Sequence, residues 1–447
     1  MKKVTEQSFL MKDTKNADKT NTEDAAGEDK PNEEASKLST SFNYINSILG
    51  SGIIAMPYAL KNAGIVLGLI LFILVSILSN YTLRLMIRNG ELSGSSSYQG
   101  MMTVCFGRIG FVITSIVQFL FPFLAIVGYN VAVGDTLTKV FGAFIGEDPQ
   151  TSSLLILNRN FIIAVTSVTF LLPLSLYRNI SRLARASLAS SLSIVFIIIS
   201  VFIRHFTLAP ALSNTSRSID LFNWSGVPKA AGLMVFSYTC HHNSLLLYCS
   251  MKEKTEQAWA QVTHLSISVV FISVVLLGVL GYLTFTENTQ GDLLENYCYD
   301  DTLMNISRIL FALNVLLTGP IECFVSREVL TNIFWSDNFS FSLLYHIVIT
   351  TSLVITAAII SLLTDCLGSV MELIGLYTGV PLAFIFPPLC YIFLKPGPKV
   401  AWSSIIPICV ILTGSVLIIS GTVLVIRDGM SSCSHGVSPQ YCTEVFN

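Results

Sequence analysis

The sequence predicts an all-α, polytopic membrane protein that crosses the bilayer many times. Hydrophobic residues make up 52% of its 447 residues and charged residues only 12%, whereas soluble domains carry about 25% charged residues. Apolar stretches of about 20 residues, the length that a helix needs to cross a bilayer, recur along the chain. Two of them are interrupted near the middle. The main expected partner is the lipid bilayer, and no basic stripe indicates a nucleic-acid partner.

Eleven apolar stretches follow a polar start. Residues 1–39 are rich in charged residues, Asn and Thr, and are expected to form a disordered cytoplasmic tail. The membrane domain is expected over 40–427. Its predicted transmembrane helices are 41–60, 64–86, 110–141, 158–176, 184–204, 227–249, 264–286, 303–330, 344–363, 367–394 and 402–426.

An odd number of helices places the two termini on opposite sides of the membrane. Basic residues gather in loops that are expected inside, such as Arg84, Arg88 and Arg108, and this bias favours a cytoplasmic N-terminus. The second tail, 428–447, is then extracytoplasmic. We expect the plasma membrane as the resident membrane, and the sequence leaves an endolysosomal membrane as the alternative.

Asn-x-Ser/Thr sequons are compatible with this orientation. Asn214 and Asn223 lie in a loop that is expected outside, and both are candidate glycosylation sites. The reversed orientation would expose the sequons at Asn179 and Asn338 instead. The sequons alone therefore do not decide between the two orientations.

Cysteines on the expected outer side can form disulfides, because that side is oxidising. They are Cys298, Cys366, Cys433 and Cys442. Cys433 and Cys442 lie close together in the C-terminal tail and are the candidate pair, although four cysteines allow three connectivities.

The first predicted helix, 41–60, is interrupted by Gly50, Ser51 and Gly52. Unpaired backbone groups cost several kcal/mol in hydrocarbon, so a broken helix is tolerated only where it faces protein or lines a cavity. Close packing is a second interpretation, because small residues let a neighbouring helix approach. A second interrupted helix half a molecule away would favour the cavity.

That second interruption lies in the sixth predicted helix, where polar or weakly polar residues occur in succession over 237–243. Polar residues at this depth need partners. If two inverted repeats span about 41–204 and 227–394, with 402–426 as an extra helix, the two breaks meet at the pseudo-twofold axis. Freed amides suit a carboxylate and freed carbonyls suit a cation, so the breaks can hold a zwitterion. The candidate substrate-binding residues are Gly50, Ser51, Gly52, Phe236, Ser237, Tyr238 and Thr239.

Three polar residues favour a sodium site beside the breaks. Asn314 and Thr318 lie four residues apart on one face of the eighth predicted helix, and Asn46 lies one turn before Gly50. Amide, hydroxyl and backbone oxygens are the hard ligands that an alkali cation needs. Each residue alone is better explained by a hydrogen bond between helices, but together with two broken helices they favour sodium.

In these motifs the chain resembles the sodium-coupled neutral amino acid transporters, within the amino acid/auxin permease group. The resemblance covers about residues 40–427 and is carried by 46–53, 236–242 and 317–320. Three further stretches resemble one member of that family most closely: 175–180, 240–243 and 291–298.

The resemblance implies a LeuT-like fold of five plus five inverted helices with one extra helix, which works by alternating access. It implies a neutral amino acid at the breaks and sodium between helices one and eight. Positions that match Asn46 and Thr318 are linked to sodium in the family, and Leu49 and Asn314 complete the expected sodium set. Relatives commonly carry a cysteine pair associated with the outer loop before helix six, but 205–226 contains no cysteine, so Cys298 is open to another partner.

His241 and His242 are candidates for proton coupling, because some members of the family exchange protons with sodium and histidine titrates near physiological pH. A histidine in a membrane is more often a neutral hydrogen-bonding strut, and this interpretation is favoured. Glu322 and Glu372 are weaker proton candidates.

The expected function is sodium-dependent secondary transport of small neutral amino acids, with proton antiport as an option. The alternative is an amino acid sensor that does not transport and signals through the N-terminal tail. No nucleophile, base and orienting group occur together, so an enzyme is not expected. No cofactor is expected besides the coupling ions, and the sequence leaves the oligomeric state open.

Overall fold

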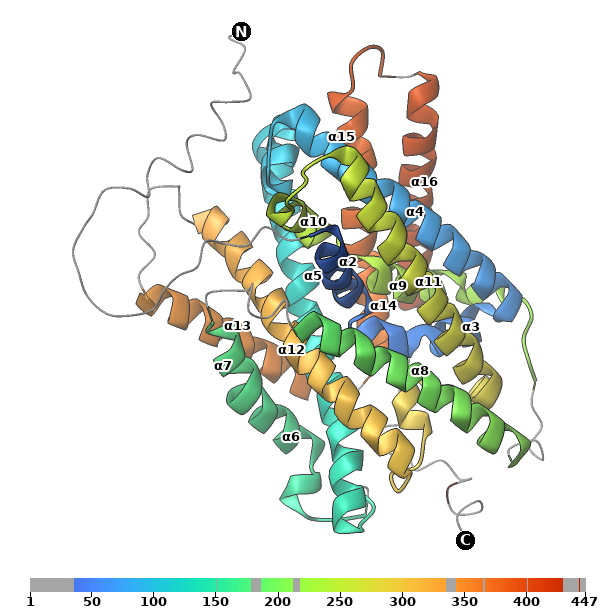
Figure 1. Ribbon diagram of the computed structural model, residues 1–447. Coiled ribbons are helices and arrows are strands. Elements are labelled where there is room, and N and C mark those ends of the chain that lie inside the picture. The colour runs from blue at the N-terminus through green and yellow to red at the C-terminus, as the bar shows by residue number, and fades with distance from the viewer. Residues whose placement is uncertain are drawn as a thin grey trace. The chain divides into compact units, whose positions relative to one another are not determined.

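A computed structural model of the protein describes residues 36–149, 151–177, 186–211, 218–334, 343–364, 366–399 and 401–428, together with Cys442. Every element in these ranges is a helix or a helical turn (Figure 1). The expected tail up to residue 35, the sequon at Asn214, and Cys433 lie outside the described residues.

Eight helices in the described part are long and apolar enough to cross a membrane. They are α4 (Ile65–Ser93), α5 (Tyr98–Ile145), α8 (Ala186–Ala211), α11 (Glu256–Phe285), α12 (Thr302–Phe334), α13 (Leu343–Leu362), the run from α14 (Leu367–Ile374) to α15 (Phe386–Leu394), and α16 (Ile405–Asp428). A shorter apolar helix spans Arg159–Ser175, from α6 (Arg159–Thr166) to α7 (Leu172–Ser175). The first and sixth predicted helices are divided into shorter pieces, so the count of eleven remains a prediction.

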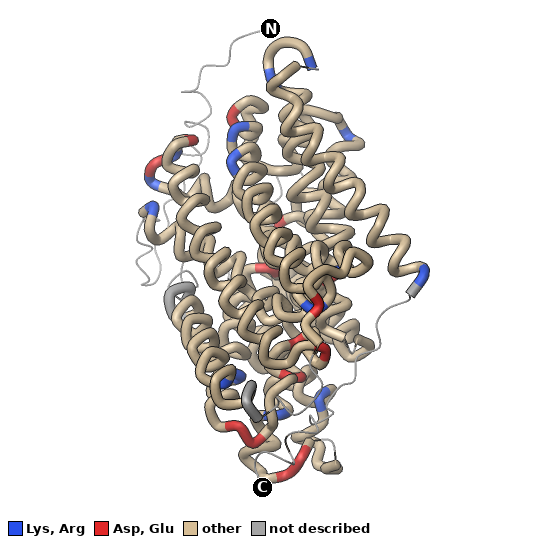
Figure 2. Tube along the Cα trace, turned by 90° about the vertical axis from the view of Figure 1, so that its right-hand side faces the viewer, with Lys and Arg blue, Asp and Glu red and all other residues tan. Residues whose placement is uncertain are grey.

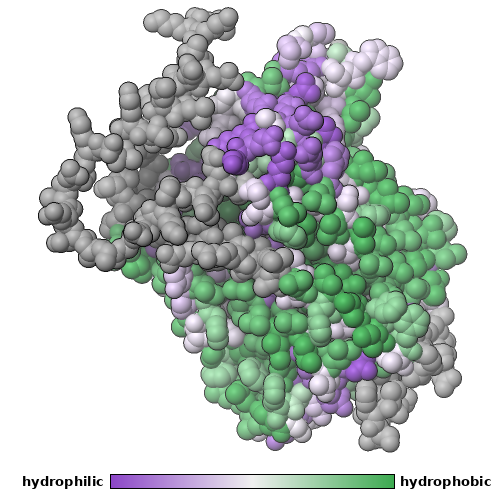
Figure 3. Space-filling view, viewed as in Figure 1, coloured by the Kyte–Doolittle hydropathy of each residue, from purple (hydrophilic) through white to green (hydrophobic). Residues whose placement is uncertain are grey.

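The outward side chains of these helices are apolar. Figure 3 shows hydrophobic residues over most of one face, with hydrophilic residues gathered at the top of the view. Most charged residues lie toward the ends of the helices (Figure 2). On α16, Leu412, Val416, Ile419 and Val423 recur at three- to four-residue spacing and are all exposed. Such a stripe is typical of a helix that faces lipid or another protein.

The first helix begins earlier than predicted. α2 (Lys37–Leu49) is capped by Ser36, whose hydroxyl accepts a hydrogen bond from the backbone N–H of Ser39 at 3.2 Å. A serine at this position satisfies one of the free amides of the first helical turn. Residues 37–39 therefore belong to the helix, which corrects the predicted end of the tail at residue 39.

The third predicted helix is part of a longer, kinked one. α5 begins at Tyr98, where the hydroxyl of Ser97 accepts a hydrogen bond from the N–H of Gly100 at 3.0 Å. At Gly107 the backbone φ is 61°, which glycine adopts readily and other residues rarely do. The stretch before this kink contains polar residues such as Gln99, which explains why the apolar pattern indicated a start only at 110.

α9 (Val227–Tyr238) is buried along almost its whole length and lies near the centre of the helices in Figure 1. It contacts a π-helical turn, η9 (Gly375–Gly379), in the tenth predicted helix. A Cβ atom at Gly375 would lie 1.8 Å from the carbonyl oxygen of Gly232, so this contact requires glycine. A second π-helical turn, η10 (Pro381–Ile385), follows. Such turns are rare and often occur at functional sites.

The predicted disulfide between Cys433 and Cys442 is wrong. Cys442 forms its disulfide with Cys298, and the two Cα atoms lie 5.7 Å apart, within the range that a disulfide requires. A cysteine makes only one such bond, and the folded path of the chain, not the short spacing in sequence, brings the partners together. Cys366 is disulfide-bonded as well.

The loop that carries Cys298 and the loop that carries Asn223 lie at the same end of the helices. The backbone N–H of Asn223 donates to the carbonyl of Ala63 at 2.7 Å, at the end of α3 (Met56–Ala63). Two residues earlier in that helix, Lys61 donates to the carbonyl of Thr289 at 3.0 Å. The glycan on Asn223 remains a prediction.

Candidate functional site

The first predicted helix is broken where the sequence indicated. α2 ends at Leu49, Gly50 has a φ of −20° and a ψ of −137°, and the tight turn η1 (Ser51–Ala55) follows before α3 begins at Met56. The last four carbonyl groups of α2, those of 46–49, lack the partners that a continuing α-helix would supply. The break therefore leaves polar backbone groups available to a ligand.

The sixth predicted helix is broken as well. α9 ends at Tyr238, Thr239 and Cys240 have non-helical backbone angles, and α10 (His241–Ser250) begins after them. The hydroxyl of Thr239 donates to the carbonyl of Val235 at 2.6 Å, which satisfies one acceptor at the end of α9. Both breaks thus lie at the positions that small and polar residues singled out.

The two breaks touch each other. A Cβ atom at Gly52 would lie 2.9 Å from the Cα atom of Ser237, so the backbone of η1 packs directly on α9. Gly50 packs on α5, where a Cβ atom would lie 2.9 Å from the hydroxyl oxygen of Tyr129. Both interpretations of the glycines therefore apply, because they interrupt the helix and also allow close packing.

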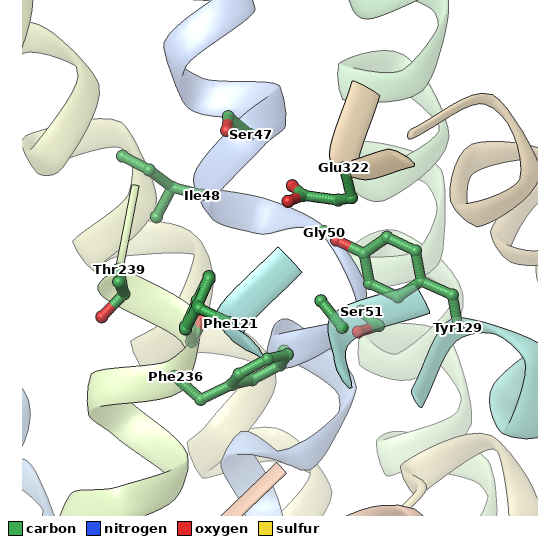
Figure 4. Close-up of a pocket in the computed structure, with 12 residues that line it drawn as sticks. Ser47, Ile48, Gly50, Ser51, Phe121, Tyr129, Phe236, Thr239 and Glu322 are labelled. Atoms are coloured by element: carbon green, nitrogen blue, oxygen red, sulfur yellow. The ribbon is translucent and has the colours of Figure 1, made fainter. Parts of the chain in front are cut away.

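A small pocket lies between the breaks, α5 and α12 (Figure 4). Its lining residues are Ser47, Ile48, Gly50, Ser51, Gly52, Phe121, Ala125, Tyr129, Phe236, Ser237, Thr239 and Glu322. The free space is about that of one water molecule, and the rings of Phe121 and Phe236, 5.8 Å apart, form part of its wall. The pocket is therefore too small for an amino acid, which can enter only when the lining side chains move.

All predicted substrate-binding residues except Tyr238 line this pocket. Tyr238 is fully buried, but it is not part of the lining. The sequence did not indicate Phe121, Ala125 or Tyr129, because apolar and aromatic residues in an apolar helix carry no distinctive signal. The sequence indicated Glu322 only as a weaker proton candidate, not as a residue of the substrate pocket.

Several polar atoms at the pocket have no hydrogen-bond partner within the described protein. They are the hydroxyl oxygens of Ser51 and Ser237 and the Oε2 atom of Glu322. All three side chains are buried. Buried polar groups are nearly always paired, so a cluster of unpaired ones at two helix breaks is typical of a ligand-binding site.

The two histidines have different surroundings. The Nε2 atom of His241 lies 2.9 Å from the hydroxyl of Thr82, and this hydrogen bond links α10 to α4. The Nε2 atom of His242 lies 3.1 Å from Oε2 of Glu322, and its backbone carbonyl accepts a hydrogen bond from Gln118. His242 is thus the one that contacts a pocket residue.

Oxygen atoms from three helices converge beside the first break. The hydroxyl of Ser190 on α8 contacts the Oδ1 atoms of both Asn46 on α2 and Asn314 on α12. A hydroxyl has one proton, so it can donate to only one of these oxygens. Three hard oxygen atoms in one place suit a small cation such as sodium. Ser190 was not predicted.

The other two predicted sodium residues lie close in sequence to this cluster. Thr318 donates its hydroxyl proton to the carbonyl of Asn314 at 2.9 Å, one turn earlier on α12. Leu49 has no polar side-chain atom and could contribute only its backbone carbonyl. Within the described residues, no group of three or more His, Cys, Asp or Glu side chains could hold a metal ion.

Comparison with known proteins decides the family. Residues 33–427 match the family model described as transmembrane amino acid transporter protein. The chain belongs to this family. Rat and human relatives are each 40% identical, and both bear the provisional name sodium-coupled neutral amino acid transporter 11. The matches cover 91% of this chain and 88% of the rat protein, and 86% of this chain and 93% of the human one.

The stretches at 175–180, 240–243 and 291–298 were predicted to resemble one member of the family most closely. The rat and human relatives are that member, which confirms the predicted resemblance. A yeast relative, vacuolar amino acid transporter 2 of Saccharomyces cerevisiae, is 33% identical over 92% of this chain and 87% of its own length. Among solved structures, the manganese transporter of Eremococcus coleocola has a TM-score of 0.57 at 12% identity, over 92% of this chain and 91% of its own. This likeness shows a shared all-helical membrane transporter fold.

Proposed function

We propose that the protein is a secondary transporter that moves small neutral amino acids together with sodium by alternating access. The meeting of two broken helices at one small pocket is the observation that carries the proposal. Free backbone groups in a membrane interior need polar partners, and the charged ends of an amino acid supply both an acceptor and a donor. Membership in an amino acid transporter family and the names of the vertebrate relatives support the same function.

The place of the oxygen cluster supports sodium coupling. Asn46 lies one turn before Gly50 in α2, while Ser190 and Asn314 belong to α8 and α12. A cation held by these three oxygens ties α2 to two neighbouring helices and fixes the break beside it. Sodium then favours the conformation that binds substrate, because a ligand shifts an equilibrium toward the state that it binds more tightly.

Eleven transmembrane helices in a LeuT-like arrangement fit this function. Repeats at about 41–204 and 227–394 place the two breaks in equivalent helices, and 402–426 is the extra helix. The N-terminus is then cytoplasmic and the tail at 428–447 extracytoplasmic. The disulfide between Cys298 and Cys442 supports this orientation, because disulfides persist on the oxidising side of a membrane. The plasma membrane is the proposed location.

His242 is the proposed proton-coupling residue where sodium transport is accompanied by proton antiport. It contacts the carboxylate of Glu322 at the pocket, whereas His241 contacts the hydroxyl of Thr82 on another helix. A histidine that exchanges a proton must sense whether the substrate site is filled, and only His242 is next to that site.

Uptake into liposomes tests the proposal. The purified full-length protein is reconstituted, and labelled alanine or glutamine is supplied with sodium outside or with choline in its place. Sodium should drive accumulation above the external concentration, and choline should not. Equal uptake in both salts would contradict sodium coupling, and saturable binding without accumulation would support the sensor.

A further inference from the structure

The pocket contains one carboxylate, and its surroundings do not explain its presence. Glu322 lies on α12 and is the one charged side chain among the twelve described residues that line the pocket. Figure 4 shows its carboxylate extending toward α2 beside Gly50. A carboxylate removed from water in this way is costly unless a cation or hydrogen-bond donors compensate it.

The contact that Glu322 makes is incomplete. Oε2 lies 3.1 Å from Nε2 of His242. The two side chains are not oriented for a hydrogen bond, however, and both atoms remain without a hydrogen-bond partner. Glu322 is 2% and His242 3% exposed. A buried pair that served only to join α12 to α10 would be expected to form a well-directed bond.

The lining of the pocket indicates what kind of ligand group the carboxylate of Glu322 can bind. Its wall is apolar on the side of α5 and α9, through Phe121, Ala125 and Phe236, and it offers hydroxyls and broken backbone near Ser51 and Ser237. A small ligand with an apolar part and one positive charge fits these surroundings. The α-ammonium group of a neutral amino acid is such a charge.

We propose that Glu322 binds the α-ammonium group of the substrate, which replaces the imidazole of His242 as the partner of the carboxylate. This inference rests on the proposed function and adds to it the residue that selects amino acids over acids without an amine. No bond is made or broken. The substrate exchanges one contact of Glu322 for a charge-assisted one, which is shorter and stronger than a neutral hydrogen bond.

The test compares alanine with lactate, which has a hydroxyl group in place of the ammonium. Binding of each compound is measured by thermal stabilisation of the purified full-length protein in detergent with saturating sodium. Glu322→Gln should weaken alanine binding at least tenfold and leave lactate unchanged, so that the preference for alanine is lost. Glu328→Gln is the matched control, because Glu328 is a partly buried carboxylate on the same helix, α12, but does not line the pocket.

His242→Gln is expected to have the opposite effect on alanine binding. It removes the group that the ammonium must replace, so alanine should bind more tightly. Equal losses of alanine binding in Glu322→Gln and His242→Gln would show a purely structural pair and overturn the proposal. Unchanged alanine binding in Glu322→Gln would overturn it too, as would a loss confined to sodium binding.

Glu322→Asp covers the case in which the glutamine variant fails to fold. The aspartate side chain keeps the negative charge but is shorter by one methylene group. It should weaken alanine binding without changing lactate binding. An aspartate variant that binds alanine as the wild type does would contradict the proposal. Failure of the proposed function would look different, because the wild-type protein itself would then show no saturable, sodium-dependent binding of alanine.

Discussion

Ser190 connects three helices through one hydroxyl group. On one side it contacts Asn46, one turn before the first break, and on the other it contacts Asn314 on α12. In the proposed sodium site each of these three oxygen atoms is a ligand, so replacing one of them should remove a ligand while the apolar contacts of the core remain.

Ser190→Ala should weaken sodium binding about tenfold or more, since a polar contact to a charged group contributes about 1.5–3 kcal/mol. The measurement is the sodium concentration that gives half-maximal alanine uptake. Ser200→Ala is the matched control, because Ser200 is buried on the same helix and donates to the carbonyl of Phe196 within it. Equal sodium dependence in both variants would exclude Ser190 from the site.

The broken helices are the elements that the sequence predicted best. Gly50 and Gly52 interrupt an apolar run, and Thr239 and Cys240 end α9 inside a polar stretch. Both signals are local, so they can be recognised without knowledge of the fold. The predicted spans also overlap the helices, with ends that differ, and the count of eleven stays a prediction.

Other parts of the site depend on packing between distant segments and could not be predicted. Ser190 is one of several serines in an apolar helix, and only the fold shows that it faces Asn46. The lining residues of α5 look like any core residues. Likewise, nothing in the spacing of Cys298 and Cys442 along the chain indicates that they are partners.

Gly52→Ala tests the contact between the two breaks. The new methyl group would lie 2.9 Å from the Cα atom of Ser237, and overpacking of this kind costs about 1–3 kcal/mol. We expect a folded protein with strongly reduced alanine uptake. Gly128→Ala should transport normally, because its methyl group would meet only Leu367 at 3.8 Å. Normal uptake by the Gly52 variant would show that the breaks need not touch.

Asp292, in the loop between α11 and α12, should make the stability of the protein depend on pH. Burial raises the pKa of Asp292 well above its ordinary value, and the charges of Glu295 and Asp135 add to the rise. The folded state then binds the proton more tightly than the unfolded state, whose pKa is about 3.9. The contribution of Asp292 to stability therefore falls as the pH rises from about 4 to the folded-state pKa, and is constant above it.

Asp292→Asn should remove this decline, because asparagine carries no charge and can still accept the hydrogen bond from the N–H of Leu294 at 2.8 Å. Thermal unfolding in detergent between pH 4 and pH 8 measures the effect. The variant should gain stability relative to the wild type as the pH rises. Parallel profiles for the two proteins would show that Asp292 is not a buried, titrating group.

At the scale of the whole molecule, orientation in the membrane can be tested through glycosylation. Asn223 lies at the same end of the helices as the disulfide-bonded Cys298, so this end should face the oxidising side. Changing Asn214 and Asn223 together to Gln should abolish a glycosidase-sensitive shift in electrophoretic mobility. Changing Asn179 and Asn338 together should leave it intact, and the reverse result would invert the topology.

We infer that the pocket and the oxygen cluster of Asn46, Ser190 and Asn314, joined through α2, work as a coupled pair. Coupling of this kind is reciprocal, because two ligands that favour the same conformation must tighten each other by the same factor. The most direct measurement is a calorimetric titration of the purified protein with alanine at several sodium concentrations and with sodium at several alanine concentrations. We predict that each ligand strengthens the binding of the other by the same factor, and alanine binding that does not change with sodium would contradict the claim.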